Sequence, residues 1–149
     1  MKDTLAGQGP LLPWIASQAL AYPALEVLHI TGIALLLGSL VLLELRVWGL
    51  ARELPIRPLA RLALPVTLAG FALVACSGLL MLSTQPAELL ANRALVIKLG
   101  LVALAALNAL WFHRRDSLGR ADGLARAQTV LSAGLWLAAI ACGRWIAYL

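Results

Sequence analysis

Side chains that could bind a metal, carry a charge or exchange a proton stand inside long apolar stretches of this chain. They are Glu26 and His29 in the first stretch, Met81 in the second, Lys98 in the third and Arg144 in the fourth. Carboxylate, imidazole and thioether groups are metal ligands, and ammonium and guanidinium groups bind carboxylates. Ionisable groups are costly inside a membrane and by default mark a functional site. These residues are therefore the candidates for chemistry.

The spacing of the candidates predicts a common depth. A helix rises about 1.5 Å per residue, which puts His29, Met81, Lys98 and Arg144 roughly 6–9 Å below the same surface. Glu26 precedes His29 by three residues and shares its helical face. We therefore expect one layer of polar or soft side chains, contributed by four helices.

Helical geometry also bears on the orientation of Arg144. Tyr148 follows it by four residues and shares its face. Cys142 lies about 200° around the helix from Arg144, because each residue turns the helix by about 100°. Both cannot point into a bundle, and we expect Arg144 to face inward and Cys142 to lie outside the site. Cys142 and Cys76 have no CxxC spacing and predict no disulfide framework.

Each candidate also has a purely structural interpretation. Lys98 and Arg144 could extend outward to lipid headgroups. Glu26 could neutralise one of these cations, and His29 could bond a backbone carbonyl. Met81 could simply fill the core.

The apolar stretches that carry the candidates cover residues 24–45, 62–82, 94–112 and 128–148. Each has about 19–22 residues, and a helix needs about 20 to cross a bilayer core. Strands are excluded because the stretches show no period-two alternation. A further segment, 11–21, is too short to span and is expected to lie at the interface.

The composition agrees with membrane helices. Hydrophobic residues make up 62% and charged residues 13% of the 149 residues, whereas soluble domains average about 45–50% and about 25%. We predict a single all-α domain over residues 1–149, an integral membrane four-helix bundle with short loops that contacts the lipid bilayer. The basic residues form no aromatic-interleaved patch, so nucleic acid is excluded as a partner.

The basic residues predict the orientation. Eight of the twelve Lys and Arg residues fall in segments 46–61 and 113–127. The positive-inside rule makes these segments cytoplasmic. Both termini are then expected on the periplasmic face of a bacterial inner membrane.

Other polar residues are expected to be structural. Glu44 and Arg46 end the first stretch and His113 ends the third, which is typical of interfacial anchors and topology signals. Asn108 is expected to form an interhelical hydrogen bond. Pro65 is expected in the first turn of the second helix, where a missing N–H costs little.

Several motifs resemble a family of small bacterial four-helix membrane proteins of unknown function. They are Glu26-x-x-His29, Glu44-Leu45-Arg46 and the finish Gly143-Arg144-Trp145-Ile146-Ala147-Tyr148, and the resemblance covers nearly the whole chain. The third stretch, from Lys98-Leu99-Gly100 to Asn108, is also similar to the copper-resistance D membrane domain, which opens with a histidine near the start of a helix. This second resemblance implies copper handling at the inner membrane, with His29 as a metal ligand.

Three functions remain open. The first is a periplasm-facing copper site of His29, Glu26 and Met81 that receives the ion from a periplasmic carrier, since imidazole and thioether suit copper. Lys98 and Arg144 would repel a cation at such a site.

The second function is electron transfer through a b-type haem or a quinone. His29 would be the axial ligand, and Lys98, Arg144 and Tyr148 would bind the cofactor. His29 and His113 are too far apart to hold one iron. A haem would need His29 with Met81, His29 alone, or His29 from two subunits of a homo-oligomer.

The third function is a non-catalytic membrane subunit in which the charges lock the helices together. Hydrolytic catalysis is not expected, because the chain has no Ser-His-Asp arrangement, no phosphate-binding glycine loop and no hydrolytic metal triad. Any enzymatic role would be that of a membrane redox component.

Overall fold

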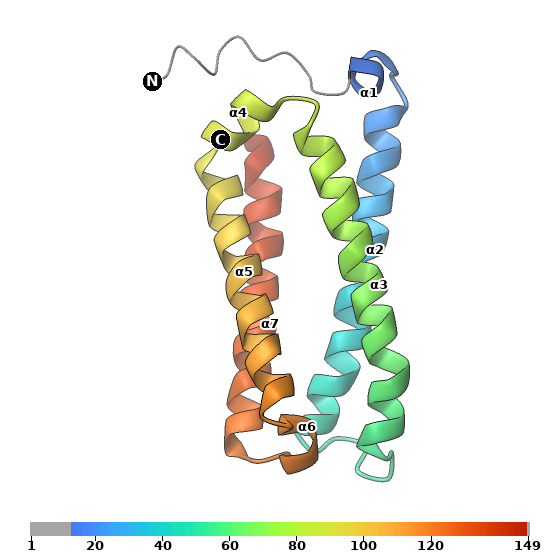
Figure 1. Ribbon diagram of the computed structural model, residues 1–149, viewed down its shortest axis with the longest axis vertical. Coiled ribbons are helices and arrows are strands. Elements are labelled where there is room, and N and C mark those ends of the chain that lie inside the picture. Colours follow the sequence, from blue (N-terminus) through green and yellow to red (C-terminus); the bar gives the residue numbers. More distant parts are fainter. Residues whose placement is uncertain (1–12, 149) are drawn as a thin grey trace.

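The computed structural model describes residues 13–148, which form a bundle of helices (Figure 1). The long helices are α2 (Ala21–Val47), α3 (Ile56–Leu82), α5 (Arg93–Arg114) and α7 (Gly123–Trp145). The short ones are α1 (Pro13–Ser17), α4 (Pro86–Ala91), α6 (Ser117–Arg120) and the 3-10 helix η1 (Ile146–Tyr148). Residues 13–148 contain no strand. The predicted all-α four-helix bundle is confirmed.

The four long helices are each long and apolar enough to cross a membrane. Large apolar side chains cover their outer surfaces, and Leu62, Leu68, Leu107 and Leu137 are 62–71% exposed. A contiguous apolar surface of this kind requires lipid around it. The chain is therefore a multi-pass membrane protein.

Two helices begin well before the predicted residues. α3 begins at Ile56 rather than at residue 62, so Pro65 lies inside the helix and its expected place in the first turn is wrong. Because proline has no N–H, the Arg61 carbonyl four residues earlier loses its helical donor. α7 begins at Gly123 rather than at residue 128, because the Asp122 carboxylate caps the helix.

Of the interfacial segment expected at 11–21, residues 11 and 12 lie outside the described part of the chain. The rest comprises α1 and the start of α2, joined by a short turn. α1, α4 and η1 all lie at the same end of the bundle, called here the α4 end (Figure 1). α6 and the connection between α2 and α3 lie at the other, the α6 end.

The helices pack as two antiparallel pairs, α2 with α3 and α5 with α7 (Figure 1). Glycines bring α2 and α3 close, since a Cβ on Gly70 would lie 2.6 Å from the Leu36 nitrogen and 2.8 Å from the Gly32 oxygen. Close backbone contact through small residues is typical of membrane helices. The Ser39 and Thr67 hydroxyls, 2.7 Å apart, join the same pair. The close approach of α2 and α3 fixes the register at which their polar residues meet.

Contacts between the two pairs involve α7. Near the α6 end, Trp48 Nε1 donates to Thr129 Oγ1 at 2.8 Å. Farther along the bundle, the rings of Phe71 and Trp136 meet edge to face with centroids 6.3 Å apart. α7 thus joins the α5–α7 pair to both helices of the other pair.

Candidate functional site

His29 on α2 is held by Ser77 on α3. Its Nδ1 atom lies 2.9 Å from Ser77 Oγ. Ser77 Oγ also lies 2.6 Å from the Leu73 carbonyl oxygen and 3.2 Å from that of Val74. The single hydroxyl hydrogen is therefore used within α3, and the Ser77 oxygen accepts from Nδ1–H of His29. This assignment, made from the hydrogen-bond network, leaves a lone pair on Nε2 of the neutral ring. The ring also bonds the backbone of Val74, which agrees with the structural interpretation of this histidine.

The His29 ring rests on a glycine of α3. A Cβ added to Gly78 would lie 3.3 Å from Cε1 of the ring and 3.7 Å from Nδ1. A larger residue at this position would push the ring away from Ser77. Ser77 and Gly78 thus form the seat of the imidazole, and sequence reasoning missed this role. The available signal was a hydroxyl next to a glycine at the predicted depth of His29.

Met81 lies one helical turn from this seat. It follows Ser77 by four residues and Gly78 by three, so it shares their face of α3. Side chains of a helix tilt toward its N-terminus, which inclines the Met81 thioether back toward the level of His29. Met81 is partly buried. The α2–α3 pair therefore carries an imidazole and a thioether on neighbouring turns.

Lys98 on α5 reaches the same region from the other helix pair. Its side chain lies along α7, since a Cβ on Gly143 would be 3.3 Å from the ammonium nitrogen. The ammonium is close enough to His29 and to Cys142 to interact electrostatically. The structure thus places His29 and Lys98 in one layer.

Arg144 points away from this layer. It is exposed, and its Nη2 atom donates to the Tyr148 hydroxyl at 2.6 Å while the guanidinium lies 5.0 Å from the centre of that ring. Cys142 is only 9% exposed. The expected orientation, with Arg144 inward and Cys142 outside, is wrong. A long cationic side chain can extend to polar surroundings, whereas a small thiol packs well inside.

Glu26 is exposed and lies one turn from His29. The ion pairs among residues 13–148 join Arg57 to Asp116 and Arg115 to Asp122. Glu26 therefore neutralises neither Lys98 nor Arg144, contrary to the structural interpretation suggested by the sequence.

The described residues contain no group of three or more His, Cys, Asp and Glu side chains that could hold a metal ion. A metal at His29 would have to draw its further ligands from Met81, from Glu26 one turn away, or from outside the described residues. His113 is exposed at the α6 end, where its Nδ1 atom lies 2.8 Å from the Ala109 carbonyl oxygen.

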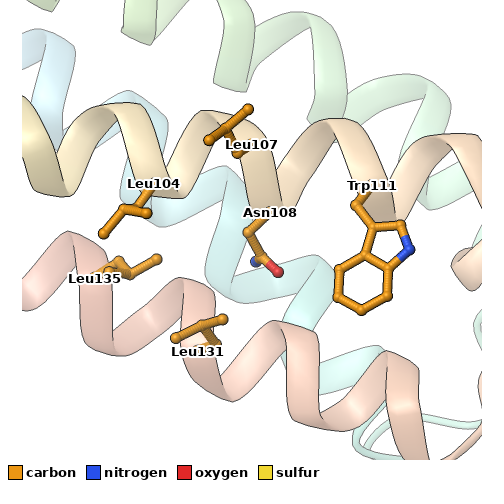
Figure 2. Close-up of a pocket in the computed structure, with 6 residues that line it drawn as sticks. All are labelled: Leu104, Leu107, Asn108, Trp111, Leu131 and Leu135. Carbon is orange, nitrogen blue, oxygen red and sulfur yellow. The ribbon is translucent and has the colours of Figure 1, made fainter.

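Asn108 forms a hydrogen bond between two helices near the α6 end. Asn108 donates from Nδ2 to the Gln128 carbonyl oxygen at 2.9 Å, which confirms the predicted interhelical hydrogen bond. Figure 2 shows this side chain pointing from α5 toward α7. It lines a groove of about 250 Å³ whose other walls are apolar, formed by Leu104, Leu107, Trp111, Leu131 and Leu135.

Glu44 is not an interfacial anchor, because it is only 3% exposed. It faces α7, whose packing against α2 covers it. Arg46 does lie at the end of the helix, where it donates to the carbonyl oxygens of Leu54 and Arg52 in the following connection.

The connection before α7 holds a bidentate ion pair outside the membrane helices. Arg115 donates to both carboxylate oxygens of Asp122, at 3.2 and 2.5 Å. This hydrogen bonding, with a further bond from the Ala125 N–H, holds the pKa of Asp122 at about 2, below the ordinary 3.8.

Chemically, the α4 end offers an oriented imidazole with a lone pair assigned to Nε2, a thioether and an ammonium group. Such a set can bind a soft metal ion or an anionic cofactor. Comparisons with protein-family models, with curated proteins and with solved structures found no match to this chain.

Proposed function

We propose that this membrane protein handles copper at the α4 end of the bundle, with Nε2 of His29 as a ligand. The observation that carries the proposal is the hydrogen bond from His29 to Ser77. Metal-binding histidines commonly donate their other ring N–H to an oxygen, which fixes the tautomer and the ring orientation. Ser77 performs this task here, and Gly78 supports the ring.

The neighbouring donors fit copper. Imidazole and thioether ligands suit copper ions, and Met81 supplies a thioether one turn from the His29 seat. Glu26, exposed on the same helix, would add a carboxylate on the side from which an ion enters. A site with such a small number of protein ligands is suited to binding the ion transiently, after transfer from a carrier, and is less suited to storing it. The resemblance to the copper-resistance D membrane domain supports the same function.

The proposed function includes an orientation of the helix bundle in the membrane. Basic residues are concentrated at the α6 end, which the positive-inside rule makes cytoplasmic. The α4 end and the His29 site would then face the periplasm of a bacterial inner membrane. Soluble periplasmic proteins could deliver the ion there.

Lys98 favours a second candidate, a b-type haem or a quinone in an electron-transfer protein. Its ammonium lies near His29, and within residues 13–148 no carboxylate forms an ion pair with it. A cation opposes copper binding but would bind a haem propionate. His29 would then be the axial ligand. Arg144, which is turned toward Tyr148, lies apart from Lys98 and His29.

The first experiment is an absorption spectrum of the detergent-purified protein from cells supplied with haem, oxidised and then reduced. Copper titrations of the wild type, His29→Ala and His113→Ala follow. His113→Ala is the matched control, since this histidine lies exposed at the α6 end. We expect no haem band, and copper binding that only His29→Ala abolishes.

Other outcomes contradict the proposal. A haem band that shifts on reduction would select the second candidate. Copper binding that persists in His29→Ala would refute His29 as the ligand. A wild type that binds neither copper nor haem would leave a quinone protein or the non-catalytic subunit as the remaining functions.

A further inference from the structure

A second group of buried polar side chains lies at the α6 end, far from His29. Glu44 of α2, Asn108 of α5 and Gln128 of α7 are 3%, 8% and 2% exposed. The Ser117 hydroxyl of α6 donates to Gln128 Oε1 at 2.9 Å, and Asn108 donates to the Gln128 backbone carbonyl. Polar contacts join α5, α6 and α7 in this cluster, and Glu44 of α2 meets it at Ser132 of α7, one turn beyond Gln128. None of these residues belongs to the proposed copper site.

Glu44 is the titratable member of this cluster. Its Oε1 atom is buried and has no hydrogen-bond partner among residues 13–148. The Ser132 hydroxyl of α7 interacts with the carboxyl group. One turn farther along α2, Trp48 donates to Thr129, which holds the two helices together around the carboxyl.

No cationic side chain of the described residues compensates Glu44. Arg46, its nearest arginine in sequence, donates to carbonyl oxygens of the connection between α2 and α3. Arg115 is paired with Asp122. The remaining titratable groups of the helices and loops at this end are exposed, namely Arg52, Glu53, Arg57, Arg61, His113, Arg114, Asp116, Arg120 and Arg126.

An ionised carboxylate without a cation is very costly in a membrane interior, whereas a protonated carboxyl group needs only hydrogen-bond partners. Gln128 shares a helical face with Ser132, four residues later, and its Nε2 donor also lacks a partner among the described residues. An unpaired N–H donor on this face of α7 opposes a bound cation there, so a charge on Glu44 would stay uncompensated.

We propose that Glu44 is a proton-binding site, which holds its proton at neutral pH and exchanges it with the aqueous phase at the α6 end. Glu44 lies three residues before the end of α2, a rise of about 4.5 Å. The path to that phase is therefore short. The site is separate from the proposed copper site and does not depend on it.

Infrared spectroscopy of the full-length protein in lipid tests the proposal. A protonated carboxyl group has a carbonyl stretching band that a carboxylate lacks. We expect this band in the wild type at neutral pH, its loss in Glu44→Gln and its retention in Glu53→Gln. Glu53 is the control because it is exposed in the connection between α2 and α3. The band should shift when water is replaced by deuterium oxide.

Glu44→Asp guards against a folding artefact, since it keeps a carboxyl group and should keep a displaced band. His29→Ala should leave the band unchanged, which separates this site from copper binding. A wild-type spectrum without the band, or a band that Glu44→Gln retains, would show that Glu44 is ionised and overturn the proposal. A band that deuterium oxide does not shift would refute proton exchange.

Discussion

Replacing Ser77 by alanine tests whether the hydrogen bond to His29 prepares the ring for a metal. Ser77→Ala removes the oxygen that lies 2.9 Å from Nδ1 of His29. The bonds that Ser77 makes within α3 are extra bonds to carbonyls of its own helix, and alanine is the best helix former. The substitution should therefore change the fold little.

The loss of the acceptor for the His29 Nδ1–H sets the expected decrease in copper affinity. A partly buried N–H without an acceptor costs about 1–3 kcal/mol, so the ring will rotate or change tautomer. At about 1.4 kcal/mol per tenfold change, this corresponds to a roughly 5- to 150-fold weaker copper affinity. Losses of about 10- to 100-fold are typical when such a supporting residue is removed from a metal site.

The assay is a copper titration of the wild type, Ser77→Ala and Ser83→Ala in detergent, with thermal unfolding measured in parallel. Ser83→Ala is the matched control, because Ser83 lies at the end of the same helix and donates to the Leu80 carbonyl. If these three proteins bind copper with equal affinity while His29→Ala does not bind it, the claim that Ser77 orients the imidazole is refuted.

Three further predictions follow from named contacts. Lys98→Ala should raise copper affinity about tenfold by removing a nearby positive charge, and a decrease in the same titration would count against the copper site. Gly70→Ala should destabilise the protein by about 1–3 kcal/mol, because its Cβ would lie 2.6 Å from the backbone nitrogen of Leu36. Thermal unfolding measures this loss. Gly100→Ala is the control, because a Cβ there would have no neighbour within 4 Å. The pKa of Asp122 is lowered from 3.8 to about 2 in the folded protein, so the Arg115 pair contributes stability above pH 4 that is lost as the pH falls toward 2. Asp122→Asn keeps a capping oxygen, and its deficit in thermal stability at neutral pH should shrink on acidification.

The spans could be predicted because apolar composition over about 20 residues is a local property of the chain. The partners of the polar residues could not, because they depend on how the helices pack. Ser77 meets His29 only at the register that Gly32 and Gly70 set between α2 and α3. Its hydroxyl alone in an apolar stretch does not indicate this contact.

The orientation of the fourth span shows the same limit. Helical geometry required that either Cys142 or Arg144, but not both, face the bundle, and the choice between them was wrong. The sequence contains no information on which face of α7 the Lys98 side chain would cover. Glu44 was likewise expected at the interface from its position near a helix end, and only the packing of α7 against α2 buries it.

The two polar sites lie on one helix, and their independence can be measured. His29 and Glu44 are fifteen residues apart on α2, a rise of roughly 22 Å. Sites separated by more than about 7–10 Å without shared partners usually have additive effects. The losses of thermal stability in His29→Ala and Glu44→Gln should therefore add in the double variant. The copper affinity of Glu44→Gln should equal that of the wild type. A copper affinity that depends on Glu44 would mean that α2 couples metal binding at the α4 end to protonation at the α6 end.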